Sequence, residues 1–257
     1  MRTIIYYTLF AAICFIFLYS CKSSDEKNNQ KALDLISVKT LGLAYLEEFK
    51  LEEAEKEFKK FIDLAPGDKF GYANLGLTCL RMGKYAEAEK QLAKAIKIDP
   101  KDPDIRLILA TVYEMDDKKD KAIAELTEAL SFAPDHIKSL YDLSELYSSG
   151  IDTESQKQYE NCLVRMVQIA PDNIVPRLSL TEVFIKNGEP DKATEQLEII
   201  RKQFPEFPGP SVEYFDKTLS DLKRNDIGNA ILNFTVFHNF LKVTSPYQAG
   251  IMDIKGP

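Results

Sequence analysis

The 257-residue chain has only two histidines and four cysteines, and it has no run of basic residues. His136 and His238 lie about a hundred residues apart, and neither stands at metal-ligand spacing from a cysteine or from the other histidine. The sequence shows no Ser-His-Asp or Cys-His arrangement, no glycine-rich phosphate loop and no metal-ligand cluster. It therefore predicts a protein that is not an enzyme and that binds no cofactor, metal or small-molecule substrate.

The charge balance excludes two further classes of partner. The net charge of the whole chain is −7. Without the first 20 residues it is −8, because the rest of the chain contains 32 basic and 40 acidic residues. Binding to nucleic acid requires a basic surface that neutralises phosphates, so nucleic acid is not an expected partner. No polybasic patch is present for anionic lipid either, so any membrane association must depend on acyl chains.

What the chain does contain is an internal repeat, marked by prolines at a fixed spacing. Pro66, Pro100 and Pro134 are 34 residues apart, and so are Pro171 and Pro205. Self-similarity at such a period is the signature of a solenoid in which each unit packs only against its neighbours.

The clearest copy of the repeat is residues 69–102. Its apolar residues form two stripes at helical spacing, separated by Gly83, which suits a helix end that needs positive φ. The small residues Gly76, Ala88 and Ala95 stand where two antiparallel helices would cross closely. The copy therefore predicts a helical hairpin.

The end of this copy predicts where the next one starts. Pro100 ends the second helix because a proline inside it would remove a backbone donor. Asp102 can then cap the following helix, with Pro103 at its first position.

This unit resembles the tetratricopeptide (TPR) repeat, with Leu-Gly, Tyr, Ala, a bulky residue, Ala and Pro at that family's offsets. The resemblance implies an all-α fold, a TPR α-solenoid of about five helical hairpins followed by C-terminal capping helices. Counting back from each proline places the repeats at 35–68, 69–102, 103–136, 137–173 and 174–207.

The fourth repeat is three residues longer than the others, and the extra length falls around residues 150–155. Tyr159 and Met166 occupy its small-residue positions, so we expect its helices to lie further apart. A tolerated loop insertion is favoured over a functional bend.

Two cysteines fall inside the repeats. Cys79 stands at the tyrosine position of its repeat, and Cys162 lies beside Leu163 and Met166. Both are expected in the core as free thiols, because a disulfide would have to join non-adjacent repeats.

The N-terminus resembles a bacterial lipoprotein signal peptide at residues 1–20. Arg2 precedes a short apolar run from Ile4 to Leu18, and the run ends at Cys21. The resemblance implies that Cys21 is lipidated, for example with palmitate, and that residues 21–34 form a flexible tether. An uncleaved N-terminal anchor is the alternative. The expected location is the bacterial cell envelope, lipid-anchored at the outer membrane on its periplasmic or surface face.

The family resemblance also implies that the first helix of each repeat lines a concave groove for a protein or peptide partner. The positions concerned are Lys39, Leu43, Phe70, Asn74, Leu77, Arg81, Leu107, Ile108, Thr111, Tyr141, Asp142, Glu145, Leu178, Glu182 and Lys186. Lys39 and Asn74 match two positions of a carboxylate clamp, but Asp104 has the wrong charge for one, so a clamp is not expected.

The groove positions are apolar in the first three repeats and acidic in the fourth, which suits an amphipathic helix or a mixed extended segment. The alternative is that several of them pack against a neighbouring segment of the same chain.

The period is lost after Pro205. Residues 207–210 form a rigid break, and Ser211 can cap a helix that extends to about residue 225 and seals the solenoid. A second helix at 227–241 is apolar on two sides and must be covered on both. Residues 237–257 resemble the connector in large secreted proteins that carry TPRs before an FG-GAP/ASPIC-UnbV propeller.

Together these features predict a membrane-anchored TPR scaffold for protein–protein interaction, which binds a partner segment in its groove. The alternatives are the repeat portion of a larger secreted FG-GAP/ASPIC-UnbV-type protein, an outer-membrane assembly factor, and an accessory subunit of an enzyme.

Overall fold

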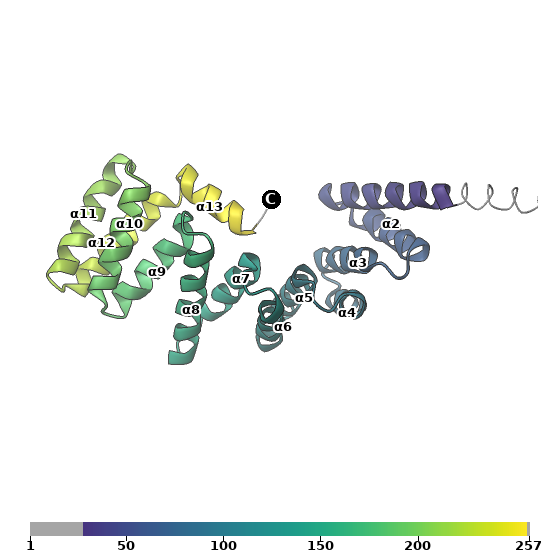
Figure 1. Cartoon of the computed structure of the whole chain (residues 1–257), viewed down its shortest axis with the longest axis horizontal. Coiled ribbons are helices and arrows are strands. Elements are labelled where there is room, and N and C mark those ends of the chain that lie inside the picture. Colours follow the sequence, from purple (N-terminus) through teal and green to yellow (C-terminus); the bar gives the residue numbers. More distant parts are fainter. Residues whose placement is uncertain (1–27, 256–257) are drawn as a thin grey trace, which may run out of the picture. The chain divides into compact units, whose positions relative to one another are not determined.

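The computed structural model of the chain describes residues 28–255, which are helical and contain no strand (Figure 1). The first helix covers residues 28–47 of the described part. The other helices are α2 (Leu51–Leu64), α3 (Lys69–Arg81), α4 (Tyr85–Ile98), α5 (Pro103–Met115), α6 (Lys119–Phe132), α7 (Ile137–Ser148), α8 (Thr153–Ile169), α9 (Ile174–Lys186), α10 (Pro190–Gln203), α11 (Gly209–Lys223), α12 (Ile227–Leu241) and α13 (Ser245–Lys255).

The chain divides into two compact units, the first ending at Asp116 and the second beginning at Asp117. The first unit contains the helix at 28–47 and α2 to α5, and the second contains α6 to α13. The predicted third repeat, 103–136, therefore has one helix in each unit. The other four predicted repeats each coincide with a consecutive pair of helices.

The first two hairpins are closed by small residues packed on bulky ones, as the repeat pattern predicted. A Cβ atom on Gly76 of α3 would lie 2.6 Å from Cγ of Leu92 in α4, so only glycine allows this approach. Ala88 and Ala95 of α4 are completely buried. The first hairpin repeats the arrangement, because a Cβ on Gly42 would lie 2.7 Å from the ring of Phe58.

Five of the turns between paired helices contain a residue at positive φ, whereas the turn between α7 and α8 does not. Gly83 has φ of +71° and Gly188 has φ of +70°, which confirms the role predicted for Gly83. Phe49, Asp117 and Asn225 occupy the same place in their turns with φ of 55–57°. A left-handed residue at this point reverses the chain and allows the second helix to pack back on the first.

Between hairpins, an acidic or amide side chain starts each of three first helices. The side chain of Asp102 accepts hydrogen bonds from the backbone N–H groups of Asp104 and Ile105, and Pro103 is the first residue of α5. Asp68 caps α3 and Asn173 caps α9 in the same way. These caps satisfy N–H groups that a helix leaves without an internal partner.

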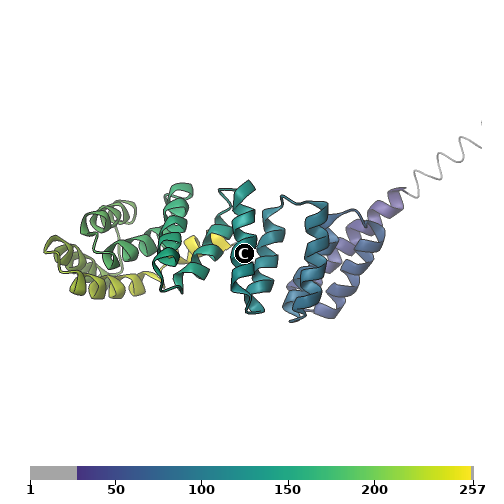
Figure 2. The same cartoon turned by 90° about the horizontal axis from the view of Figure 1, so that it is seen from below.

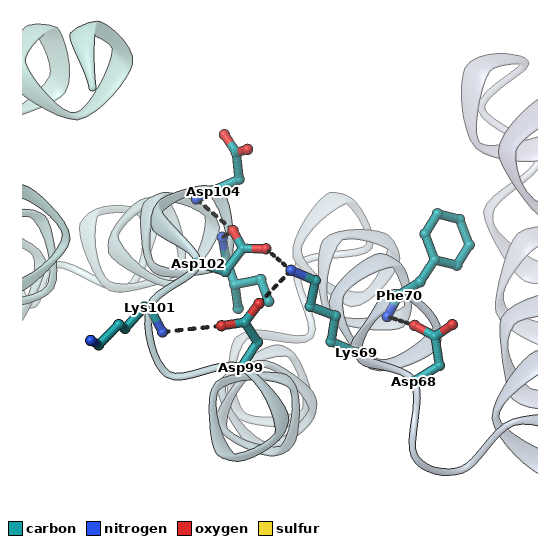
Figure 3. A network of polar contacts seen from close by, with 8 residues as sticks. Asp68, Lys69, Phe70, Asp99, Lys101, Asp102 and Asp104 are labelled. Atoms are coloured by element: carbon teal, nitrogen blue, oxygen red, sulfur yellow. Dashed lines mark hydrogen bonds and ion pairs between the residues drawn. The ribbon is translucent and has the colours of Figure 1, made fainter. Parts of the chain in front are cut away.

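A lysine at the start of α3 contacts the turn that leads into the next repeat (Figure 3). The Nζ atom of Lys69, at the start of α3, lies 2.5 Å from Asp102 and 2.6 Å from Asp99, which flank the turn between α4 and α5. The hydrogen bonds to Asp102 and then to Asp99 raise the pKa of Lys69. Because Asp102 also caps α5, the contact fixes the register of one repeat on the next.

The extra residues of the fourth repeat lengthen a helix rather than a loop. Helix α8 has 17 residues, whereas α4, α6 and α10 have 14 each. The side chain of Asp152 accepts a hydrogen bond from Ser155 N–H and so caps α8 at the point where the insertion falls. The expectation of a loop insertion is therefore wrong, because the capped N-terminus extends α8.

Both repeat cysteines are free and buried, as predicted. Burial raises the pKa of the Cys79 thiol and raises that of Cys162 to about 11. Both thiols are therefore protonated at neutral pH, which makes them poor nucleophiles.

The tail after Pro205 forms a further hairpin although the period is lost. Helices α11 and α12 pack along each other, and their turn contains Asn225 at positive φ (Figure 1, Figure 2). Helix α12 has the bounds predicted for it. The capping role expected of Ser211 is wrong, because the N-cap is Pro208 and the Ser211 hydroxyl donates to the Pro208 carbonyl oxygen from inside the helix.

Helix α13 was not predicted, although it lies in the segment expected to be a connector. It packs on α7 and α9, the first helices of the fourth and fifth repeats (Figure 1, Figure 2). The segment thus covers repeats of its own chain.

The N-terminal predictions fall largely outside the described residues. The signal peptide at 1–20, the lipidated Cys21 and the tether as far as residue 27 all precede them. Residues 28–34, also expected in the flexible tether, are helical and continuous with the first helix. In the described part of the chain, no helix has the length and apolar character needed to cross a lipid bilayer.

Candidate functional site

The predicted groove positions of the first unit lie on three first helices, namely residues 28–47, α3 and α5. Leu43, Leu77, Leu107 and Ile108 are each half-buried. Leu43 and Leu77 stand at the same offset of successive first helices, Leu107 and Ile108 lie on the next first helix, and α3 contacts α5 directly. We call this face, formed by the predicted positions on these three helices, the first-helix surface of the first unit.

Two polar residues of this surface form hydrogen bonds within their own helices. The amide nitrogen of Asn74 donates to the carbonyl oxygen of Phe70 at 2.9 Å. The hydroxyl of Thr111 donates to the carbonyl oxygen of Leu107 at 3.0 Å. Because each has a partner one turn back along its helix, contact with a bound segment rests mainly on the apolar side chains between them.

The two cations of the surface join neighbouring helices. The Nζ atom of Lys39 lies 4.4 Å from the centre of the Phe70 ring. The guanidinium of Arg81 donates to the carbonyl oxygen of Leu46 at 2.8 Å and lies 5.3 Å from the Phe49 ring. Arg81 therefore occupies the C-terminal end of the first helix, where a cation is favoured by the helix dipole.

The corresponding surface of the second unit is already covered. Leu178 of α9 is 0 % exposed, and helices α12 and α13 both pack on α9. Tyr141 and Asp142 of α7 are partly buried, whereas Glu145 remains exposed. The alternative considered from the sequence, that a segment of the same chain covers these positions, describes the second unit.

Glu182 lies at the centre of a polar cluster on this covered surface. Its carboxylate is 2.6 Å from Nζ of Lys186, one turn along α9, and 3.7 Å from Nδ1 of His238 in α12. The contact with His238, helped by Lys186 and opposed by burial, lowers the pKa of Glu182 to about 2. The His238 ring is only 8 % exposed and lies 5.8 Å from the Tyr247 ring of α13.

A pocket of about 430 Å³ adjoins this cluster where α8 begins and α9 ends. Tyr159, Ser179, Glu182, Lys186 and Asn187 are among its lining residues. Burial raises the pKa of Tyr159 to about 12, although a hydrogen bond with Ser179 acts in the opposite direction. Tyr159 is one of the two bulky residues that stand at small-residue positions in the fourth repeat. Its side chain therefore lines this pocket where the repeat pattern would place a small residue.

Sequence reasoning missed the residues that connect α13 to the repeats. Asn173 caps α9 and also donates from its side chain to the carbonyl oxygen of Gly250, at 2.9 Å. The available signal was Pro246 near a helix start, followed by Tyr247, Gly250 and Ile254 at helical spacing.

The comparisons with known proteins agree with this architecture. The tetratricopeptide repeat family model matches residues 45–112 and 80–143. A comparison with curated protein sequences gives no match.

Solved structures of similar fold come from several proteins. The crystal structure of MamA is 19 % identical over 66 % of this chain and 91 % of its own, with a TM-score of 0.53. MamA from Desulfovibrio magneticus RS-1 is 18 % identical over 66 % of this chain and 97 % of its own, with a TM-score of 0.52. PilF from Pseudomonas aeruginosa is 14 % identical over 87 % of this chain and 99 % of its own, with a TM-score of 0.58.

At these identities the solved structures support the fold alone, whereas the family model supports the assignment of the repeats. The matched residues include the hairpin in which Gly76 packs on Leu92. Residues 45–143 therefore carry tetratricopeptide repeats, in a chain with an all-α solenoid fold.

Proposed function

We propose that the chain is a lipid-anchored scaffold that holds a partner protein near a bacterial membrane, and that the partner binds the first-helix surface of the first unit. Four half-buried aliphatic side chains on three adjacent first helices carry the proposal: Leu43, Leu77, Leu107 and Ile108. TPR hairpins form protein–protein interaction scaffolds, and an aliphatic face of this kind suits an amphipathic helix or a mixed extended segment.

The first unit is favoured over the second because its aliphatic side chains are partly exposed, whereas the second unit's own C-terminal helices pack on its surface. In the second unit, α12 and α13 pack on α9 and bury Leu178 completely. In the first unit, the polar groups of Asn74 and Thr111 bond within their own helices, and the aliphatic side chains remain partly in water. Removing that area from water would favour binding.

The surface is tested by placing charge at its centre. We expect Leu77→Arg combined with Ile108→Arg to reduce recovery of the partner in a pull-down from membranes by roughly ten-fold, because each arginine would be buried under the bound segment. Circular dichroism should show that the variant keeps its helix content.

A matched control is Ile98→Arg, which replaces an exposed residue at the end of α4, the second helix of the same repeat. It should recover the same partners as the unaltered chain. If the double variant also recovers an unchanged set of partners, binding does not take place on this surface.

The anchor is tested at Cys21, which lies outside the described residues. The proposal rests on the short apolar run that ends at this cysteine and on the absence of a polybasic patch. We expect Cys21→Ser to move the protein from the membrane to the soluble fraction and to abolish incorporation of labelled palmitate. Cys79→Ala, at a buried cysteine, should leave both unchanged. Membrane retention of the Cys21→Ser protein would argue against lipidation.

A further inference from the structure

Helix α13 lies on the surface that the repeat pattern assigned to a partner in the second unit. It is 11 residues long and packs on α7 and α9, the two first helices that carry Tyr141, Glu145 and Leu178 (Figure 1). The short segment 242–244 connects it to α12. A helix of the chain thus occupies the place where a TPR groove would hold a ligand helix.

Three residues at positions i, i+3 and i+7 of α13 face the rest of the second unit, and the first of them, Tyr247, contacts α12. The ring of Tyr247 lies 5.8 Å from that of His238. The carbonyl oxygen of Gly250 accepts the hydrogen bond from Asn173, and Ile254 is 0 % exposed. Residues at this spacing share one side of a helix, as in other complexes of a helix in a groove.

Gly250 determines how closely α13 approaches the repeats. A Cβ atom at this position would lie 2.6 Å from Oδ1 of Asn173 and 3.0 Å from Cγ2 of Val175. Because Asn173 is buried and also caps α9, it cannot move aside without loss of the cap. The surface therefore accepts a helix that presents glycine at this point.

The fit of α13 is incomplete at its edges. A hollow of about 480 Å³ lies between its Ala249 side and the turn before α9, and another of about 490 Å³ lies beside Pro246. Met252 on the outer face is 66 % exposed. An isolated helix of this length is marginal in water, so α13 depends on this contact for its structure.

We propose that the first-helix surface of the second unit is a binding groove for an amphipathic helix, which α13 fills in cis until a partner helix displaces it. This proposal is independent of the one for the first unit. The partner helix presents an aromatic residue, a glycine three positions later and a β-branched or aliphatic residue four positions after that, as in Tyr247, Gly250 and Ile254. Basic residues at its flank would face Glu145, which is exposed at the edge of the groove.

The groove is tested with a labelled peptide of residues 243–255 added to the full chain. In the unaltered chain the tethered α13 competes at a high effective concentration, so the added peptide should bind weakly. In a Gly250→Arg chain the new side chain collides with Asn173 and releases α13, and the same peptide should bind roughly ten-fold more tightly or better. Fluorescence anisotropy gives both dissociation constants.

Two controls make the result specific. Met252→Arg places the same side chain on the exposed face of the same helix, so that chain should bind the peptide as weakly as the unaltered one. A peptide that carries the Gly250→Arg change should bind neither chain. Equal affinity of the normal peptide for the unaltered and Gly250→Arg chains would overturn the proposal.

Two measurements distinguish release of α13 from unfolding of α9 and from dimer formation. Hydrogen exchange should increase in α13 of the Gly250→Arg chain and stay slow in the centre of α9. If α9 also exchanges quickly, Tyr247→Ala serves as the releasing variant, and failure of that chain to bind the peptide more tightly also overturns the proposal. If sedimentation shows that the unaltered chain is a dimer that the peptide dissociates, the groove holds α13 of a second copy, and the proposal of a cis occupant is wrong.

Discussion

Replacing Leu92 with alanine is expected to lower the free energy of unfolding of the first unit by about 3 kcal/mol. Leu92 is completely buried in α4, and its Cγ atom lies where the side chain of residue 76 would otherwise be. Because Gly76 has no side chain, α3 has no group at this position that can move into the vacated space. The cavity should therefore persist, and its cost should be in the middle or upper part of the range for leucine.

The measurement is urea denaturation followed by circular dichroism, with hydrogen exchange in α3 and α4 to locate the loss, because repeat proteins open unit by unit. The control is Leu77→Ala, a leucine of the same hairpin that is half-buried on the first-helix surface. It should lose about 1 kcal/mol, since it buries less area. Equal losses at the two positions would contradict the packing described.

The same contact predicts an interaction between two substitutions. In the unaltered chain, Gly76→Ala places a Cβ atom 2.6 Å from Cγ of Leu92 and should be destabilising. In the Leu92→Ala chain the same methyl group enters the vacated space. The double variant should therefore be more stable than the sum of the single losses by about 1 kcal/mol or more. Additive losses would show that the two residues do not determine each other's packing.

The repeat boundaries could be predicted because the information that defines a hairpin is local. Gly76, Ala88 and Gly83 each have a role within one 34-residue unit, and Asp102 caps a helix that begins at the next residue. No knowledge of distant segments is needed to place these helices. The sixth hairpin, α11–α12, obeys the same turn rule through Asn225, but its lack of the small-residue pattern concealed it.

The occupant of the second unit's groove could not be placed from the sequence. The hydrogen bond between Asn173 and Gly250 joins residues 77 positions apart. Neither residue indicates the other in the sequence, because asparagine is common at helix N-caps and glycine is common in turns. The sequence allowed that some groove positions pack against the chain itself, and three-dimensional packing was needed to show that these are in the second unit.

The first unit shows a different limit of prediction from the sequence. Its groove positions were predicted from the family offsets, and they lie on three first helices, where the aliphatic ones are half-buried. Lys39 and Arg81, however, were predicted as groove positions, and each also contacts an aromatic ring of its own chain. Such a contact depends on the separation of neighbouring helices, which the offsets do not specify.

Acidification is expected to weaken the packing of α12 on α9, and Glu182 should account for roughly 2 kcal/mol of the loss. The polar contact with His238 of α12, together with that of Lys186, holds the pKa of Glu182 at about 2, whereas the ordinary value is 4.5. A carboxylate with a lowered pKa stabilises the folded state fully above its ordinary pKa. That stabilisation is lost as the pH falls from about 4.5 towards 2. The magnitude is reduced from the full shift because the side chain is partly exposed.

The groups that face this carboxylate come from three helices. Lys186 is on α9 itself, His238 is on α12, and Tyr159 of α8 has its pKa raised in part by the charge of Glu182. Of these groups, Glu182 is the carboxylate with the lowered pKa, so it is the group whose negative charge is lost in this pH range. The loss should therefore follow the protonation of Glu182.

Glu182→Gln separates this effect from general acid denaturation. At pH 7 the variant should be less stable than the unaltered chain by roughly 2 kcal/mol, and the difference should vanish as the pH approaches 2, where both side chains are neutral. Hydrogen exchange in α12 at a series of pH values reports this packing directly.

The control is Glu198→Gln, at an exposed position of α10, which should show no such difference. A difference between Glu182→Gln and the unaltered chain that stays constant from pH 7 to pH 2 would mean that the charge of Glu182 does not hold α12 on the repeats. Because His238 also contacts Tyr247, loosening of α12 should also expose α13, and faster exchange in both helices at low pH would link the contact between Glu182 and His238 to the occupancy of the groove.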